Sequence, residues 1–302
     1  MLRLPDGLLG HEIELAGVTV TAEMIAHYAH LVGATPAASG EAPPTFCLSM
    51  RRGMTPEVQL PPNMFGIYGG HDLEFHHPIR AGEQYRATNT IVEVYEKIGR
   101  SGTLTVVVRE AVICDGSGTV AARIVERQIV RQRPETAARI ASPQEIASAP
   151  TPQEEAWTGN ALGRSVAGID LGHELGPWRR PTPTAAVIAR YAETADIAEE
   201  LFTSAPAARR LGYRGVVVPG PMLAAFMEQF VRRELPGWPL ERLSATFRVP
   251  TITGDTIVLR GVITERHELT DGERIVCDLL IEHSDGERAV TGTATVRQPA
   301  DA

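Results

Sequence analysis

A stretch near residue 70 carries four side chains suited to proton transfer: Tyr68, His71, His76 and His77. Histidine changes charge near neutral pH, which suits it to acid–base chemistry, and a tyrosine hydroxyl donates a proton or a hydrogen bond. The surrounding pattern predicts a strand, on which alternation places His71 and His77 on one face and His76 on the other. A single histidine on a strand is more often structural than catalytic. The four side chains are nevertheless candidates for a site, because their residue types can transfer protons.

Carboxylates gather in a second stretch, at Glu193, Asp196, Glu199 and Glu200. Glu193 and Asp196 share one helix face at a spacing of three residues if the helix continues that far. General acid–base catalysis needs two such groups facing one substrate carbon. The alternative interpretation is a solvated helix end, which is the commoner setting for charged residues.

The segment 215–235 is predicted to position these groups, because a short buried approach leads there into a long helix. Gly220 permits a tight turn, and Pro221 suits the first helical position, where its missing N–H costs nothing. The helix start presents backbone N–H groups and a positive dipole end, which can stabilise a developing oxyanion such as the enolate of a thioester. The alternative is a core helix with a well-formed start.

Two motifs occur twice in the same order, which predicts that one fold is present twice. Residues 21–29 match 184–192 at an offset of 163, and residues 75–78 match 247–250 at an offset of 172. Alternating strand patterns separated by Gly-containing turns follow in each half. We therefore expect an α+β double hotdog, in which two antiparallel sheets each wrap around a central helix.

Composition supplies the expected domain boundaries. Residues 134–160 are rich in Pro, Ala, Ser, Gln and Glu, which is typical of a surface linker. We expect an N-terminal hotdog domain over 1–133, a linker over 134–181 and a C-terminal hotdog domain over 182–302.

These motifs carry a resemblance to a known family. The C-terminal half resembles a MaoC-like dehydratase domain, as in (R)-specific enoyl-CoA hydratases, through residues 191–192, 208–213, 216–220, 247–250 and 254–255. The N-terminal half resembles the fatty-acid-synthase-type dehydratase-like domain that precedes MaoC-like domains, through residues 28–29, 32–33, 42–46, 69–70, 74–78 and 99–102. The pairing is also similar to mesaconyl-CoA-type hydratases. The resemblance implies a pseudo-dimer of hotdogs that hydrates 2-enoyl thioesters, or dehydrates 3-hydroxyacyl thioesters, without a metal.

The sequence departs from the family at the catalytic motif. The family carries an Asp and a His in D-x-N-P-x-H, and these positions are Ile197 and Phe202 here, while Pro219 replaces the His of His-Gly. Neither Ile197 nor Phe202 can move a proton. The catalytic candidates are therefore the nearby groups Asp196, Glu199, His71 and Tyr68. Gly220 and Arg248 are candidates for substrate binding, although a surface salt bridge explains Arg248 equally well.

Composition and charge exclude several other classes of function. The net charge is −8 with scattered basic residues, which does not fit a nucleic-acid interface. No apolar run is long enough to span a membrane. Cys47, Cys114 and Cys277 are too widely spaced for a metal site or a disulfide framework, so we expect a reduced, cytoplasmic protein without a cofactor.

Three hypotheses for the function remain open. The leading one is a hydro-lyase acting on an acyl-CoA or acyl-carrier-protein thioester, with a diverged acid–base set and a place in a specialised or secondary-metabolic pathway. The second is a non-catalytic binding subunit of a heteromeric dehydratase, and the third is a hotdog isomerase or thioesterase. A homodimer or a heteromeric partner is compatible with each of them.

The altered dyad gives a first prediction. We expect crotonyl-CoA hydration to be very weak or absent, because positioned proton transfer contributes about 10²–10⁴-fold per group, and Ile197 and Phe202 provide none. A spectrophotometric assay with the purified protein measures this rate. A rate equal to that of an ordinary enoyl-CoA hydratase would contradict the alignment of these two positions with the dyad.

Overall fold

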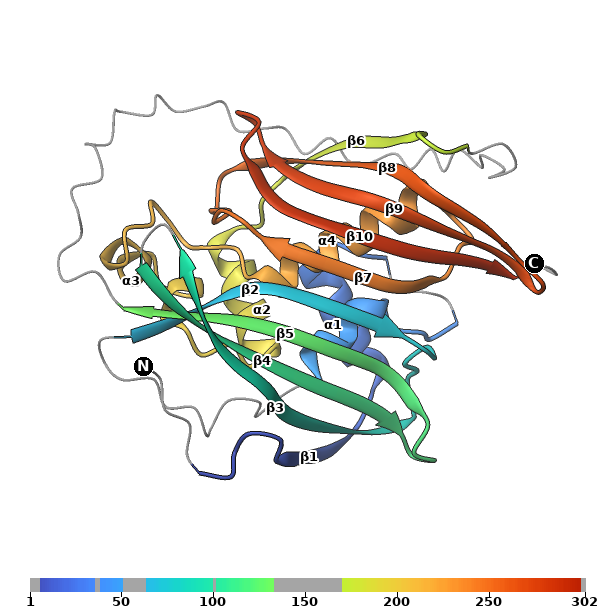
Figure 1. Ribbon diagram of the computed structural model, residues 1–302, viewed down its shortest axis with the longest axis horizontal. Helices are drawn as coiled ribbons and strands as arrows, with labels where there is room; N and C mark the ends of the chain where they lie inside the picture. Colours follow the sequence, from blue (N-terminus) through green and yellow to red (C-terminus); the bar gives the residue numbers. More distant parts are fainter. Residues whose placement is uncertain (1–5, 36–38, 51–63, 100–101, 133–169, 300–302) are drawn as a thin grey trace.

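Within the described residues, ten strands form one antiparallel sheet in the computed structural model (Figure 1). The structure describes residues 6–35, 39–50, 64–99, 102–132 and 170–299. The strands are β1 (Glu12–Thr19), β2 (Met64–Phe75), β3 (Gln84–Gly99), β4 (Gly102–Asp115), β5 (Val120–Gln132), β6 (Glu174–Pro181), β7 (Leu240–Phe247), β8 (Thr256–Leu269), β9 (Gly272–His283) and β10 (Arg288–Pro299). Their order across the sheet is β1-β3-β4-β5-β2-β7-β10-β9-β8-β6.

The strand order contains one five-strand unit twice, as β1-β3-β4-β5-β2 and, in reverse, as β6-β8-β9-β10-β7. This repeat confirms the double hotdog. The two units meet where β2 pairs with β7 in antiparallel register. Asp72 lies opposite Ser244 in this seam, and Ser244 follows Asp72 by 172 positions, the offset of the repeat in the sequence. Equivalent residues therefore face each other at a pseudo-two-fold axis. The two expected sheets are joined edge to edge as one.

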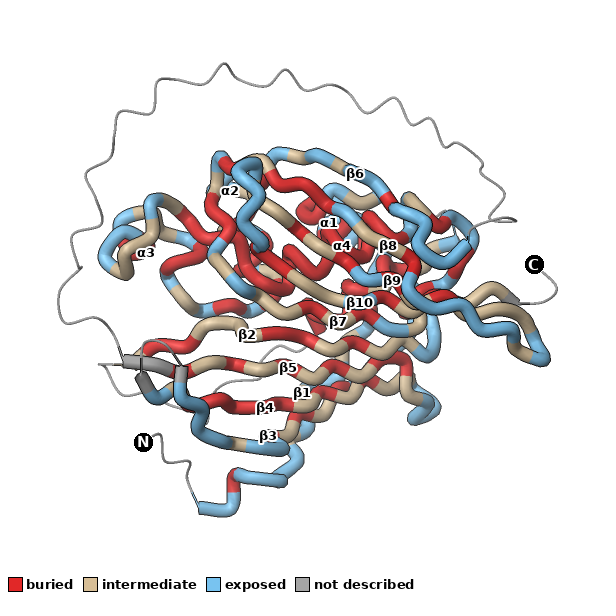
Figure 2. Tube along the Cα trace, turned by 45° about the horizontal axis from the view of Figure 1, so that its top comes forward, coloured by how far each residue is buried: buried red, intermediate tan, exposed pale blue. Residues whose placement is uncertain are grey.

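The longer helices lie together on one face of the sheet (Figures 1 and 2). They are α1 (Ala22–Val32), α2 (Ala185–Thr194) and α4 (Gly220–Glu234); the shorter ones are α3 (Ala205–Arg210) and the 3₁₀ helices η1 (Pro44–Ser49) and η2 (Glu200–Phe202). Thr21 and Thr184 cap α1 and α2 equivalently, each accepting a bond from a backbone N–H three residues ahead. The repeated residues Tyr28 and Tyr191 contact each other, with ring centroids 6.0 Å apart.

The central helix differs between the two halves. In the C-terminal half α4 is buried along nearly its whole length, as its apolar spacing predicts. In the N-terminal half η1 occupies the place of the first turn of α4. Pro43 and Pro219 share one backbone conformation, and the bond from Ala42 N–H to Ile79 O matches that from Val218 N–H to Thr251 O, at 2.8 Å each. Residues 51–63 lie outside the described part, so a longer N-terminal central helix stays a prediction.

The structure corrects two expectations from the sequence: where the linker ends, and how far strand β2 extends. Residues 174–181 form β6 rather than linker, since they pair with β8 as the outermost strand of the C-terminal half. The remaining linker residues up to 169 lie outside the described residues. The predicted alternation of three histidines is also wrong, because β2 ends at Phe75 and both His76 and His77 lie exposed beyond it, whereas His71 is buried.

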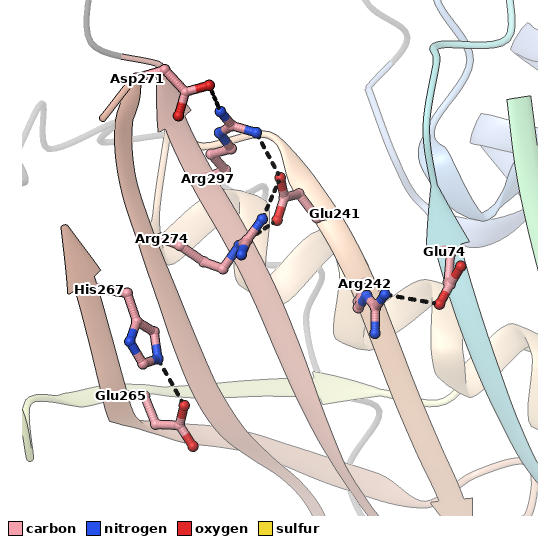
Figure 3. Close-up of polar contacts among 8 residues, drawn as sticks. All are labelled: Glu74, Glu241, Arg242, Glu265, His267, Asp271, Arg274 and Arg297. Atoms are coloured by element: carbon pink, nitrogen blue, oxygen red, sulfur yellow. Dashed lines mark hydrogen bonds and ion pairs between the residues drawn. The ribbon is translucent and has the colours of Figure 1, made fainter. Parts of the chain in front are cut away.

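The opposite face of the sheet carries ion pairs and is open to solvent. Figure 3 shows Glu74 of β2 reaching Arg242 of β7 at 3.1 Å across the seam. Glu241 of β7 pairs with Arg274 of β9 at 2.8 Å and with Arg297 of β10 at 3.6 Å. Such exposed pairs contribute about 0–1 kcal/mol each. They make this face polar, as expected for an antiparallel sheet covered by helices on one side only.

Close packing between α4 and the sheet gives a prediction on stability. A Cβ at Gly292 of β10 would collide with the Ser244 carbonyl of β7 and would lie 2.9 Å from the Met227 methyl of α4. We expect Gly292→Ala to lower the free energy of unfolding by about 3 kcal/mol, through overpacking. The matched control is Gly116→Ala in an exposed turn, where the nearest atom is 3.8 Å away. Urea unfolding of both variants checks this, and equal stabilities would contradict the close packing of β10 against β7 and α4.

Candidate functional site

Four polar side chains form a buried network on the helix-covered face of the N-terminal half. His71 Nε2 lies 3.1 Å from Glu126 Oε2, and Arg109 Nη1 lies 3.4 Å from Glu126 Oε1. Arg109 also donates to Gln128 Oε1 at 2.8 Å. His71, Glu126 and Arg109 are at most 3% exposed. A buried ion pair of this kind is costly unless its groups are paired and hydrogen-bonded, as they are here.

The register of three neighbouring strands assembles this network. Arg109 of β4 lies opposite Glu126 of β5, which in turn lies opposite His71 of β2. Side chains at directly opposed positions project from the same face of a sheet. The three groups therefore meet although 17 and 55 positions of sequence separate them.

A β-bulge brings Tyr68 to the same face as His71. Residues three apart on a regular strand face opposite sides, but the register shifts between Tyr68 and Gly70, so that Tyr68 opposes Gln128 while His71 opposes Glu126. The rings of Tyr68 and His71 are 5.5 Å apart. Glycine suits the bulge because a Cβ at Gly70 would lie 2.8 Å from the Ala245 carbonyl oxygen.

The network lies beside the start of α4 and beside Phe202. Phe247 packs its ring edge against His71, with centroids 5.4 Å apart, and the same ring covers Gly220. Phe202, which the sequence predicts to stand at one dyad position, lies 6.1 Å from Tyr68 between ring centroids. The structure thus brings together three of the predicted residues, Tyr68, His71 and Gly220, although they come from different halves of the chain.

The other predicted residues lie at the surface or partly buried. Asp196 follows α2 in an exposed left-handed conformation, with φ of 52°. Glu199 is half-buried, and its carbonyl accepts the Phe202 N–H at 3.1 Å. Arg248 is exposed just beyond β7, where its Nε donates to Thr291 Oγ1 at 3.3 Å. Of these three residues, Glu199 is hydrogen-bonded to Phe202, whose ring packs near Tyr68.

The C-terminal half provides an internal reference for the network, because its equivalent positions are apolar. The pseudo-two-fold pairing relates His71 to Leu243, Glu126 to Ala294, Arg109 to Cys277, Tyr68 to Leu240 and Gln128 to Val296. Burial raises the pKa of the Cys277 thiol to about 12, so this counterpart is an inert thiol. The fold therefore does not require polar groups at these positions, and their presence in the N-terminal half makes them candidates for a functional role.

Sequence reasoning missed Glu126, Arg109 and Gln128. The signal was present in residues 120–130, where Ile124, Glu126, Gln128 and Val130 alternate with outward residues. Two polar residues at inward positions of a predicted strand break the apolar pattern. Their partners could not be assigned without the register of β2, β4 and β5.

Metal-binding and membrane-spanning features are absent from the part of the chain that the structure describes. Its His, Cys, Asp and Glu side chains form no group of three or more that could hold a metal ion. Its helices are all too short or too polar to cross a membrane.

Comparison with known protein families and sequences confirms the resemblance. Residues 8–124 match the family model for a FAS1-like dehydratase domain region. A mesaconyl-C(4)-CoA hydratase of Chloroflexus aurantiacus is 27% identical over 183 residues, which cover 60% of this chain and 55% of the relative. The match therefore spans about half the length of that relative.

Solved structures with low sequence identity share the fold. A MaoC-like dehydratase superposes with a TM-score of 0.76 at 16% identity, over 97% of this chain and 99% of that protein. A conserved hypothetical protein of Mycobacterium tuberculosis with a double hotdog fold superposes with a TM-score of 0.64 at 14% identity, over 96% of both chains. At these identities the solved structures support the double hotdog fold.

The contact between Gly220 and Phe247 gives a prediction for the start of α4. A Cβ at position 220 would lie 2.6 Å from the Phe247 ring. We expect Gly220→Ala to destabilise the protein by about 1–3 kcal/mol through overpacking. In the Phe247→Ala background the same change should cost much less, since the ring is gone. A double-mutant cycle by urea unfolding measures this coupling, and additive effects would contradict the contact.

Proposed function

We propose that this MaoC-like double hotdog protein adds water to, or removes water from, an acyl-CoA thioester, with His71 and Glu126 replacing the missing dyad. The observation that carries the proposal is the buried His71–Glu126 pair at 3.1 Å, on the same face as Tyr68 and in contact with the ring that covers Gly220. A histidine oriented by a carboxylate is an established arrangement for general base catalysis.

His71 acts as the base in the proposed dehydration. It removes the α-proton of a 3-hydroxyacyl thioester, the electron pair forms the Cα–Cβ double bond, and the β C–O bond breaks. The departing hydroxide takes a proton and leaves as water, and hydration is the reverse. Glu126 stabilises the imidazolium, and Arg109 pairs with the Glu126 carboxylate at 3.4 Å.

Tyr68 and the start of α4 have supporting roles in this mechanism. Tyr68 lies on the same face as His71 and supplies the proton or hydrogen bond for the leaving oxygen. The positive end of the α4 dipole favours negative charge on the thioester oxygen as the enolate forms. This polarisation comes from the backbone, so the loss of the family's Asp and His leaves it intact.

The apolar surroundings favour an acyl chain as substrate. Ile197 and Phe202 are 7% and 4% exposed, so the dyad positions now form part of the core. Phe247 is half-buried between His71 and Gly220, which places an aromatic wall beside the reacting carbons. A place in a specialised pathway is part of this proposal, because the acid–base set departs from that of the family.

Substitution of the pair tests the proposal. We expect His71→Leu, which copies the equivalent Leu243, and Glu126→Gln each to lower turnover by about 10²–10⁴-fold. The assay follows the enoyl absorbance with mesaconyl-C4-CoA and with 2-enoyl-CoA thioesters of increasing chain length. The matched control is His76→Leu, an exposed histidine just beyond the same strand, which should keep the wild-type rate.

The outcomes of this assay separate the rival functions. Folded variants with unchanged turnover would refute the role of His71 and Glu126. A wild-type protein that binds the thioesters without converting them would favour the non-catalytic binding subunit. Release of free CoA would instead indicate a hotdog thioesterase.

A further inference from the structure

His71 is fully buried, although the proposed function requires it to meet a substrate. Its exposed fraction is 0%, and its Nε2 faces the Glu126 carboxylate at 3.1 Å. The substrate proton therefore has to go to Nδ1, which is buried as well. A general base works within about 3 Å of the atom that it deprotonates, so one of the groups that cover His71 has to move before the reaction.

Two aromatic rings cover His71, and both belong to partly exposed residues. The ring of Tyr68 lies 5.5 Å from the imidazole, and that of Phe247 lies 5.4 Å from it, between centroids. Tyr68 also lies 6.1 Å from the ring of Phe202, which is only 4% exposed. Tyr68 thus packs beside two buried rings, which favours Phe247 as the cover that moves.

The position of Phe247 in the sheet favours the same choice. The pairing of the seam ends with Thr246 opposite Gly70, and Phe247 is the next residue and the last of β7. Tyr68, in contrast, lies within β2, opposite Gln128 of β5. A rotation of the Phe247 side chain therefore leaves the seam intact, and side chains with access to solvent change rotamer quickly.

The ring of Phe247 also covers the start of α4. A Cβ built at Gly220 would lie 2.6, 2.8 and 3.0 Å from three atoms of this ring, so the ring rests where only a glycine leaves room. One side chain therefore covers both the proposed base and the helix start that polarises the thioester. A thioester that brings its carbonyl oxygen to the helix start and its α-carbon to His71 has to occupy the place of the ring.

We propose that Phe247 controls access to the site. Its ring closes the site over His71 and Gly220, and a thioester enters by taking the place of the ring as the side chain rotates outward. The proposal rests on the proposed function for the identity of the entering molecule. While the ring is in place, it keeps water away from the buried charges of Glu126 and Arg109, whose mutual attraction is stronger in surroundings of low polarity.

The reactivity of His71 towards a small reagent tests this control of access. Diethyl pyrocarbonate modifies imidazoles that it can reach, and peptide mass spectrometry gives the rate at each histidine. If the open state has a population of about 0.1–10%, His71 should react about 10–10³-fold more slowly than the exposed His76. Phe247→Ala should raise the His71 rate by about 10-fold or more and leave the His76 rate unchanged.

Two further variants accompany this measurement. Phe75→Ala removes the same ring from the equivalent strand end in the N-terminal half, where Phe75 is also half-buried, and should leave the His71 rate unchanged. Phe247→Leu keeps an apolar side chain at the position and should raise the His71 rate by less than Phe247→Ala does. The leucine variant provides the test if the alanine variant does not fold.

Fluorine NMR tests whether a thioester displaces the ring. A 4-fluorophenylalanine is placed at position 247, and the probe is butyryl-CoA, a saturated thioester that can be neither hydrated nor dehydrated. Binding should move the fluorine resonance and increase its solvent isotope shift, because the ring leaves the side chain of His71 and enters water.

The outcomes separate this proposal from the proposed function. An unchanged His71 rate in the folded Phe247 variants, or no displacement of the labelled ring by bound butyryl-CoA, would overturn the control of access. If His71→Leu then still abolishes turnover, the proposed function stands without it. If the ring is displaced and His71 becomes reactive in Phe247→Ala, but the wild type converts no thioester, the control of access is supported and the proposed function is refuted.

Discussion

The antiparallel pairing of β2 with β7 is the interaction on which the rest of the structure depends. Five registered pairs join residues 70–74 to 242–246. This seam converts two curved sheets into one and sets Asp72 against its repeat equivalent, Ser244. Because side chains alternate along a strand, a slip of one residue would turn His71 away from the helices and towards solvent. The seam therefore fixes the fold and the candidate site together.

The two halves differ in the residues at equivalent inward positions of the strands, which are apolar in one half and polar or charged in the other. In the C-terminal half the inward positions hold Leu243, Ala294 and Cys277, which bury apolar surface at no electrostatic cost. In the N-terminal half the same positions hold a histidine, a carboxylate and a guanidinium. Removing such charges from water costs several kcal/mol per ion, and their mutual pairing offsets part of this. If stability were the only requirement, apolar residues like those of the C-terminal half would suffice at these positions.

Local rules made much of the fold predictable. Thr21 and Thr184 satisfy N-cap requirements, the apolar spacing of α4 predicts a buried helix, and Gly-containing turns mark the hairpins. Each of these signals acts over a few residues, so it can be recognised from the chain alone. Strand β6 was missed because Pro177 and Pro181 interrupt its pattern, and only its pairing with β8 identifies it. The histidine alternation failed because the end of β2 at Phe75 is set by tertiary packing.

The sequence by itself determined that one fold occurs twice and which family it resembles, and it predicted that Ile197 and Phe202 stand at the positions of the expected dyad. It also supplied Tyr68, His71 and Gly220 as candidates, because their residue types carry the relevant chemistry. Only the tertiary structure decided that these three belong together and that Glu126 and Arg109 complete the set. The physical reason is that strand register, and not distance along the chain, determines which side chains meet. A single bulge next to Gly70 reverses the facing of Tyr68, and such a shift depends on contacts with β5 and β7.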